Sequence, residues 1–256
     1  MSIAFFRSTL LMVVAVSAPA QWQNLPSKGI PRTKDGKPNL TAPAPRRADR
    51  KPDLSGIWQA PGPKYLRDLT ADLKPGDVPM QPWAEALTNE RKELVHAVEE
   101  SDANCLPQGV PKINATPVPF KIVQEPGEVI VLYEAFDQFR QFFMDGRRPP
   151  EDPNPTWLGY STAKWDGDVL VVDTKGFNGK TWLDQLGHPA TDALHVTERF
   201  RRVDYGHLEI GVTIDDPKAY TKPWSVTEVM ELLPETELLE FVCNENNRDL
   251  PHLRNN

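Results

Sequence analysis

The stretch from Thr156 to Thr174, TWLGYSTAKWDGDVLVVDT, constrains the fold of this chain more than any other. Two runs rich in apolar and β-branched residues flank an Asp-Gly dipeptide at 166–167, which is typical of a two-residue hairpin turn. A turn at this dipeptide predicts that Trp165 faces Asp168. Since all four residues of 169–172 are apolar, that strand should be covered on both faces. The chain is therefore expected to fold around a β-sheet.

Further short runs, bounded by turn residues, have the composition of strands. They are Phe120–Gln124, Glu128–Glu134, Phe139–Met144, His195–Val203, Leu208–Ile214, Pro223–Leu233 and Glu237–Cys243. Many short strands with close turns predict a mainly β protein, folded as a single antiparallel β-barrel, with a β-sandwich as the alternative. Pro82 suits the first position of a helix, and the spacing of Trp83 and Leu87 predicts one packed helix over 82–101.

The segment Gly56-Ile57-Trp58 resembles the first-strand motif of lipocalins and related calycin barrels. In that motif the tryptophan closes the floor of the barrel, so the resemblance implies a calycin-like barrel. A second set of motifs, NCLPQGVPKI, DGRRPPEDPNPTWLGYS, WDGDVLVVDTKGFN, LHVTERFRR and VTIDDPKAYTKPW, resembles a family of exported bacterial β-rich proteins without an assigned activity. This likeness implies export and a β-rich domain. Where those proteins often have a histidine after DGR-x, this chain has Pro149.

The chain divides into three parts by composition. Residues 1–20 predict a cleaved signal peptide, because Arg7 precedes an apolar run at 10–16 and small residues follow it. The protein is therefore expected to be periplasmic or secreted. Residues 21–52, rich in proline and basic residues, predict an extended arm that is loose or laid over the domain. Residues 53–256 predict a single β-rich domain, with no run long enough for a transmembrane segment.

The arm contains an internal repeat, and the domain contains two cysteines. DGKPNLTA at 35–42 is echoed by DRKPDLSG at 49–56, and two copies are too few for a solenoid. Cys105 and Cys243 suit an oxidising compartment, so we predict a disulfide between them, with two free buried thiols as the alternative. In the chain-entropy account, such a bridge stabilises the fold by about 4–5 kcal/mol.

Charge and motif content exclude several classes of function. The formal net charge is −7, and the basic residues form no stripe, which argues against nucleic-acid binding. The sequence lacks a glycine-rich phosphate loop, a dinucleotide fingerprint and a nucleophile elbow, so no cofactor is predicted. His188, His195 and His207 are seven and twelve residues apart, which is not a metal-ligand spacing, so no metal site is predicted.

The hairpin formed by His195–Val203 and Leu208–Ile214 contains the most informative polar residue. If a three-residue loop joins the strands, one face is apolar and Glu198 lies in its middle. A carboxylate there must be paired or protonated, which makes Glu198 a candidate general acid or base, or a polar anchor in a cavity. A structural ion pair with Arg140 is the alternative, since buried Arg–Glu pairs are common in barrels.

Two further residues of this hairpin are candidates for acid–base chemistry. His195 lies at the same end as Asp215 and Asp216, so it could act as a base with an orienting carboxylate. A surface histidine near acidic residues is the simpler interpretation. Arg199 or Arg140 would stabilise an oxyanion in such an enzyme.

The hairpin predicted over 156–174 suggests a place for a ligand. Gly159, Ser161 and Ala163 share one face, and three small residues leave room for a ligand or for a large neighbouring side chain. The residues that we predict to contact a ligand are Arg140, Arg147, Trp157, Tyr160 and Ser161.

Three functions follow from these patterns. The first is binding of a small, largely apolar or weakly acidic molecule in the barrel cavity. The second is a cofactor-independent lyase, isomerase or hydrolase that uses Glu198 or His195. The third is interaction with a cell-envelope protein through the arm.

Overall fold

The computed structural model describes residues 29–74, 76–93, 99–151 and 154–245. The predicted signal peptide at 1–20 and the first part of the predicted arm, 21–28, lie outside the described residues.

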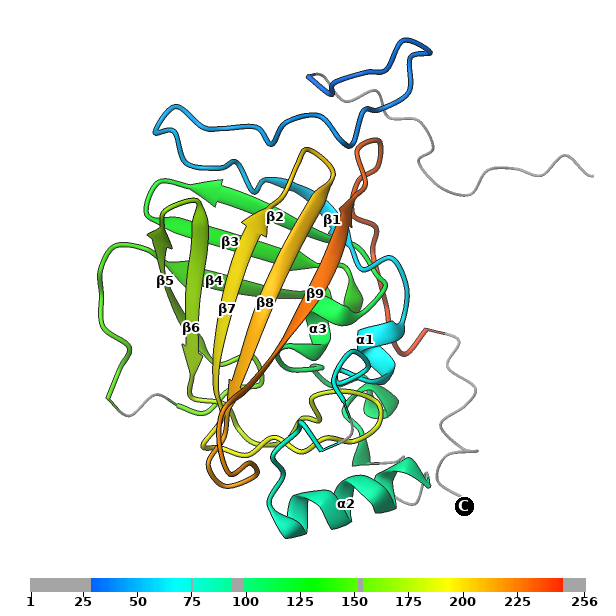
Figure 1. The fold of residues 1–256 in the computed structure, drawn as a ribbon, viewed down its shortest axis with the longest axis vertical. Helices are drawn as coiled ribbons and strands as arrows, with labels where there is room; N and C mark the ends of the chain where they lie inside the picture. Colours follow the sequence, from blue (N-terminus) through cyan, green and yellow to red (C-terminus); the bar gives the residue numbers. More distant parts are fainter. Residues whose placement is uncertain (1–28, 75, 94–98, 152–153, 246–256) are drawn as a thin grey trace, which may run out of the picture.

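Nine strands close into one barrel, with each strand next to its neighbour in the sequence (Figure 1). The strands are β1 (Gly56–Gln59), β2 (Phe120–Glu125), β3 (Glu128–Tyr133), β4 (Gln138–Phe143), β5 (Tyr160–Asp166), β6 (Val169–Lys175), β7 (His195–Arg202), β8 (His207–Asp215) and β9 (Trp224–Leu232). Closure comes from the pairing of β9 with β1, where Trp58 lies opposite Leu232. The predicted barrel is confirmed, and the β-sandwich alternative is wrong because no free edge separates two sheets.

One strand pair departs from the predicted antiparallel order. β4 and β5 run parallel and pair only through Phe142 with Ser161 and Phe143 with Thr162. The other neighbouring pairs are antiparallel. The connection between β4 and β5 includes 147–155, in which four of nine residues are proline, so it cannot pair as a strand. The barrel wall is therefore held together at this point by a very short contact.

The two central hairpins test the predicted registers. In the β7–β8 hairpin, Glu198 lies opposite Val212, as a three-residue loop predicts. In the β5–β6 hairpin, Asp166 closes the turn opposite Val169, so the predicted pairing of Trp165 with Asp168 is wrong. The turn lies one residue later because Gly167, with φ of +58°, is its first loop residue, the position at which a type II′ turn requires glycine. The shift in pairing is two residues, so every side chain stays on its predicted face.

The helices are short; α2 lies away from the barrel wall, whereas all four residues of α3 are buried (Figure 1). They are α1 (Lys64–Arg67), α2 (Pro82–Lys92) and α3 (Lys112–Ala115), with single 3-10 turns η2 (Asp102–Asn104) and η3 (Ala135–Asp137). The predicted helix over 82–101 begins at Pro82 as expected but ends at Lys92. Its buried residues are Ala84 and Thr88, whereas Trp83, predicted to pack, is 45% exposed; the predicted part at 94–98 lies outside the described residues. Among the described residues, no helix is long and apolar enough to cross a membrane.

The chain after β9 differs from the predicted strand over 237–243. This segment has no regular structure in the described residues, because β9 already pairs with β1 and leaves no edge for it. It is instead fastened from outside by a disulfide between Cys105 and Cys243, whose Cα atoms are 5.6 Å apart. The predicted disulfide is confirmed.

Residues 29–52 cross one end of the barrel (Figure 1). The backbone N–H of Gly206, in the β7–β8 turn, donates to the carbonyl of Leu40 at 2.7 Å. Arg46 forms a two-point ion pair with Asp168 in the β5–β6 turn, at 3.0 and 2.5 Å. In its described part, the arm is therefore laid over the domain.

The repeat in the arm is also a structural repeat. Arg32 and Arg46 each donate a hydrogen bond of 2.8 Å to the carbonyl of the residue four positions later, Gly36 and Arg50. Both acceptors have positive φ, +83° and +67°. Arg32 also pairs with Glu235 at 2.6 Å. The same turn thus recurs at the start of each copy, and the arginine three residues before each copy ties the arm to the chain after β9 or to the β5–β6 turn.

Trp58, the tryptophan of the Gly-Ile-Trp motif, is fully buried. Its indole N–H donates to the carbonyl of Leu54 at 3.0 Å, and the guanidinium of Arg202 lies 4.9 Å from its ring. Arg202 also donates to the carbonyl of Asp53 at 2.5 Å. The tryptophan of the motif is therefore held in the core through the chain before β1 and through β7.

Candidate ligand-binding site

The pocket with the clearest chemical character lies where β4 and the start of β5 separate. It has a volume of about 480 Å³. Its walls come from the first half of β4, from the segment 156–161 and from Pro107 near the disulfide. Because β4 and β5 pair at only two positions, the pocket contacts residues of both faces of the wall. Phe139 faces outward and is 61% exposed, whereas Arg140 and Ser161 face the interior and are buried.

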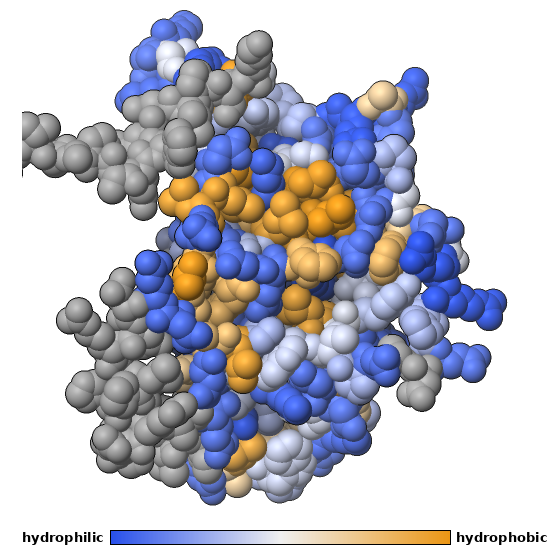
Figure 2. All heavy atoms as spheres, turned by 180° about the vertical axis from the view of Figure 1, so that it is seen from behind, coloured by the Kyte–Doolittle hydropathy of each residue, from blue (hydrophilic) through white to orange (hydrophobic). Residues whose placement is uncertain are grey.

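The pocket opens next to an apolar surface. Figure 2 shows the side of the molecule opposite to Figure 1, on which β2, β3 and β4 form the nearer wall and apolar side chains gather at the centre. On these strands, Leu132 lies opposite Phe139, and both are exposed. Phe139 also lines the pocket, so the apolar outer wall of the pocket continues onto this surface.

The structure brings four of the five predicted ligand-binding residues together around the pocket. Arg140, Trp157, Tyr160 and Ser161 line the pocket. Arg147 does not line it, but its guanidinium lies 4.0 Å from the ring of Phe143, which does. The charge of Arg147 is satisfied by Asp145 at 2.5 Å, and that hydrogen bond lowers the pKa of Asp145 to about 2. Arg147 thus contributes packing near the pocket and no free positive charge.

Arg140 connects the pocket to a buried polar network. Its two terminal nitrogens donate to the two carboxylate oxygens of Glu198 at 3.0 and 2.5 Å. Thr174 accepts a third hydrogen bond from Arg140 at 3.2 Å, and the hydroxyls of Ser161 and Thr174 are 2.9 Å apart. The Nε of Arg140 is buried and has no hydrogen-bond partner among the described residues. The network therefore balances the charge of Arg140 but does not use all of its donors.

A second branch of the network orients Glu198 from the opposite side. The amide nitrogen of Asn114, on α3, donates to Glu198 at 2.7 Å. Tyr133 in turn donates its hydroxyl hydrogen to Asn114 at 2.8 Å, and burial raises the pKa of Tyr133 to about 12. Sequence analysis missed Asn114, because a residue in a short connector carries no periodic signal that would place it against the barrel interior.

Glu198 forms the buried ion pair with Arg140 that the sequence suggested as the alternative to an acid–base role. It is fully buried, and both of its oxygens are bonded to Arg140. His195 lies opposite Asp215 across the hairpin, as predicted, but its Nε2 contacts the carboxylate of Asp173, 2.8 Å away. These contacts commit both residues to partners within the fold.

Arg199 and Asp216 are also placed by the structure. Arg199 is exposed on the outer face of β7 and pairs with Asp166 at 2.9 Å, so it cannot meet a group beside Glu198. Asp216 is buried and accepts hydrogen bonds from the backbone and hydroxyl of Thr191, which fixes a loop. The candidate acid–base residues are therefore not assembled around one point.

Glu228 is the interior residue that sequence analysis missed. It is fully buried on β9, and neither carboxylate oxygen has a hydrogen-bond partner among the described residues. Burial raises the pKa of Glu228 well above its usual value, and the negative charge of Glu198 adds to this effect, while Arg140 opposes it. The alternation of β9, with Val226 and Met230 also inward, carried the same signal that identified Glu198.

The raised pKa of Glu228 predicts that the stability of the protein depends on pH. Because the folded-state pKa of Glu228 lies above its unfolded value near 4.5, its contribution is fully favourable below pH 4.5 and is lost as the pH rises toward the folded-state pKa. We expect Glu228→Gln to match the wild type at pH 4 and to be the more stable protein at pH 7 to 8, measured by urea denaturation. The matched control is Glu231→Gln on the exposed face of the same strand. A difference between Glu228→Gln and wild type that does not change with pH would contradict the prediction.

Comparisons with known proteins add only a distant likeness. No model of a known protein family matches the chain, and no curated protein matches it. Among solved structures, a mutant of the fluorescent protein UnaG is 16% identical to the chain. The alignment covers 72% of this chain and 97% of that protein, with a TM-score of 0.33.

Proposed function

We propose that the pocket between β4 and the segment 156–161 binds a small, largely apolar molecule. The observation that carries this proposal is a pocket of about 480 Å³ with aromatic side chains in its outer wall and buried Arg140 and Ser161 in its inner wall. Sites for small molecules have this volume and this combination of apolar surface with a few fixed polar groups.

The polar groups of the pocket define which end of the ligand goes inward. Arg140 has an unused Nε–H donor, and Gln138, also in the wall, has a buried side-chain oxygen without a partner among the described residues. The positive charge of Arg140 is balanced by Glu198. A carbonyl, hydroxyl or weakly acidic group therefore suits the inner end better than a strongly charged anion.

The enzymatic alternative and the interaction alternative receive less support from the contacts. Glu198 has no free oxygen, and His195 lies on the outside of the barrel beside Asp173. The described part of the arm is bound to the turns of its own barrel. We therefore place ligand binding first. Export to the periplasm or the medium, which the sequence predicts, would supply a reason for a carrier of this kind.

The first test is native mass spectrometry at low activation energy on protein purified from the periplasm. We expect a discrete non-covalent adduct that disappears on denaturation. Titration with the neutral apolar probe N-phenyl-1-naphthylamine then places the site, because its fluorescence rises in an apolar pocket. Trp157→Ala should weaken probe binding about tenfold, since one aromatic wall is lost.

Val229→Ala is the matched control for this titration, because Val229 is an exposed apolar residue on the outer face of β9. It should leave the affinity for the probe unchanged. Equal loss of binding in the two variants would mean that the probe reads general surface hydrophobicity. No saturable binding by the wild type, together with a clean apo mass, would overturn the proposal.

A further inference from the structure

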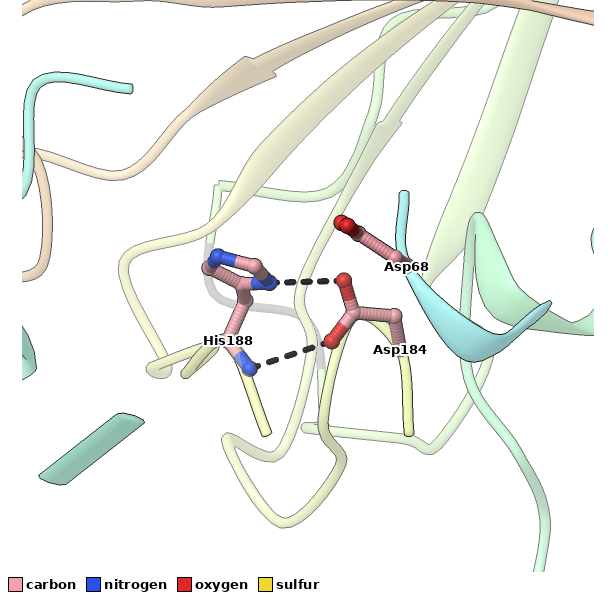
Figure 3. Close-up of side chains that lie close together, drawn as sticks. All are labelled: Asp68, Asp184 and His188. Atoms are coloured by element: carbon pink, nitrogen blue, oxygen red, sulfur yellow. Dashed lines mark hydrogen bonds and ion pairs between the residues drawn. The ribbon is translucent and has the colours of Figure 1, made fainter. Parts of the chain in front are cut away.

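A second cluster of polar side chains lies away from the pocket, in loops outside the barrel strands. Figure 3 shows Asp68, Asp184 and His188 with their polar atoms turned toward one another. One possible ligand atom from each residue lies within 4.8 Å of those of the other two. Asp184 is fully buried and His188 is 3% exposed, whereas Asp68 is partly exposed. The cluster therefore has a closed side and an open side.

The loops hold these side chains in place through the backbone. The N–H of Leu69 donates to Asp184 at 2.8 Å, across 115 positions of the sequence. The chain next to these residues is joined by two further backbone hydrogen bonds, from Gln185 to Leu66 at 2.9 Å and from Leu186 to Arg67 at 3.0 Å. The cluster is thus built on two segments that are fastened together.

Each carboxylate of the cluster is also oriented individually. Asp68 accepts hydrogen bonds from the backbone and the hydroxyl of Thr70, at 2.8 and 2.6 Å, through the same oxygen. Asp184 accepts from the backbone of His188 at 3.2 Å and lies 2.6 Å from its Nδ1. Such outer contacts orient ligands in metal sites. The second oxygen of Asp68 keeps no hydrogen-bond partner among the described residues.

The charge of the cluster is the independent observation that points to a cation. Two carboxylates lie side by side, one of them fully buried, and in the described part of the chain neither forms an ion pair with a lysine or arginine. Among the described residues, their partners are the imidazole of His188, the hydroxyl of Thr70 and backbone N–H groups, none of which carries the fixed positive charge of a lysine or arginine. The two carboxylates therefore leave a local negative charge that a bound positive ion would balance.

We propose that Asp68, Asp184 and His188 bind a divalent transition-metal ion of the Zn²⁺ class. One imidazole nitrogen and two carboxylate oxygens form a mixed set that suits such an ion better than Mg²⁺ or Ca²⁺, which prefer oxygen ligands alone. Three protein ligands leave a fourth position for water or a substrate. Asp68 and His188 also line a surface hollow of about 570 Å³, from which the ion can enter.

Ion binding requires only a small change in the cluster. The ion replaces the hydrogen bond between Nδ1 of His188 and Asp184, and the imidazole proton moves to Nε2, which points away from both carboxylates in Figure 3. A neutral histidine therefore releases no net proton. Ligand atoms around a tetrahedral Zn²⁺ are about 3.3 Å apart, so the 2.6 Å contact must widen. Sequence spacing predicted no metal site because the carboxylate of Asp68 is supplied from a distant part of the chain.

The test is isothermal titration calorimetry of the tag-free, full-length mature protein with Zn²⁺, after treatment with a chelator. We expect one ion per chain for the wild type. Asp68→Asn and His188→Gln should each weaken binding at least tenfold, because each removes one ligand while leaving a side chain of the same size. Thermal unfolding of the wild type should shift upward with Zn²⁺ and that of Asp68→Asn should not.

The control variants are His195→Gln and His207→Gln, which disrupt His–Asp pairs that belong to no three-ligand cluster among the described residues. Both should bind Zn²⁺ as the wild type does. Substitution of Co²⁺ provides a readout of the coordination sphere, since its visible absorption should differ between the wild type and His188→Gln. Wild-type affinity in both cluster variants, no 1:1 binding by the wild type, or equal affinity for Mg²⁺ would overturn the proposal.

Discussion

Glu198→Gln should lower the free energy of unfolding by about 3–5 kcal/mol, measured by urea denaturation. Both members of the Arg140–Glu198 pair are almost completely buried, so the variant removes the carboxylate that pairs directly with the guanidinium in the barrel interior. Since a domain of this kind has about 5–15 kcal/mol of total stability, the loss should be visible as partial unfolding on mild heating.

The Arg201–Glu209 pair on the outer face of the same hairpin is the matched control. Its ion-pair distance is the same, 2.5 Å, but its side chains are 52% and 32% exposed. Glu209→Gln should therefore cost less than about 1 kcal/mol. Replacement of both buried partners, Arg140→Met with Glu198→Leu, should cost less than Glu198→Gln alone, because no unpaired charge remains. If the double variant were the least stable, the buried pair would contribute more than charge balance.

Loss of the Cys105–Cys243 disulfide is expected to have an effect of similar size. The bridge spans 138 positions, and in the chain-entropy account its removal lowers the free energy of unfolding by about 4–5 kcal/mol. The measurement is urea denaturation of the variant that carries both Cys105→Ser and Cys243→Ser. Dithiothreitol should lower the stability of the wild type to that of the variant and should not affect the variant itself.

Other contacts of the C-terminal segment limit this effect. The ring of Phe241 lies 5.5 Å from that of Phe136, and the N–H of Leu239 donates to Glu134 at 3.0 Å. If the variant were as stable as the wild type, these contacts would be sufficient to hold the segment. Pro107, two residues after Cys105, lines the ligand pocket, so the variant should also bind the naphthylamine probe less well.

The strands and their faces could be predicted because both depend on neighbours in the sequence. Alternation with a period of two identified the inward face of β7 and placed Glu198 on it. An error of two residues in the β5–β6 register did not change the face of Ser161, since a shift of two preserves the alternation. The same rule would have identified Glu228, whose side chain lies on the inward face of β9.

Local sequence patterns could not predict two other features of the fold. The segment 237–243 has the composition of a strand, but whether it joins a sheet depends on a free edge, and β1 occupies that edge. The helix at 82–92 was predicted, but the exposure of Trp83 depends on what covers the helix rather than on its own periodicity. These errors concern pairing and burial, and each was decided by a distant segment.

By itself, the sequence determined most of the barrel strands, the inward face of β7 with Glu198 on it, and the two cysteines that can pair. Only the tertiary structure decided how these parts meet: the short parallel contact between β4 and β5 that opens the pocket, the pairing of Arg140 with Glu198, and the joining of Asp68 to Asp184 and His188. The physical reason is the distance along the chain over which each kind of interaction acts. Side-chain periodicity and turn chemistry act over a few residues, whereas barrel closure, ion pairing and ligand clusters depend on residues brought together from distant parts of the chain.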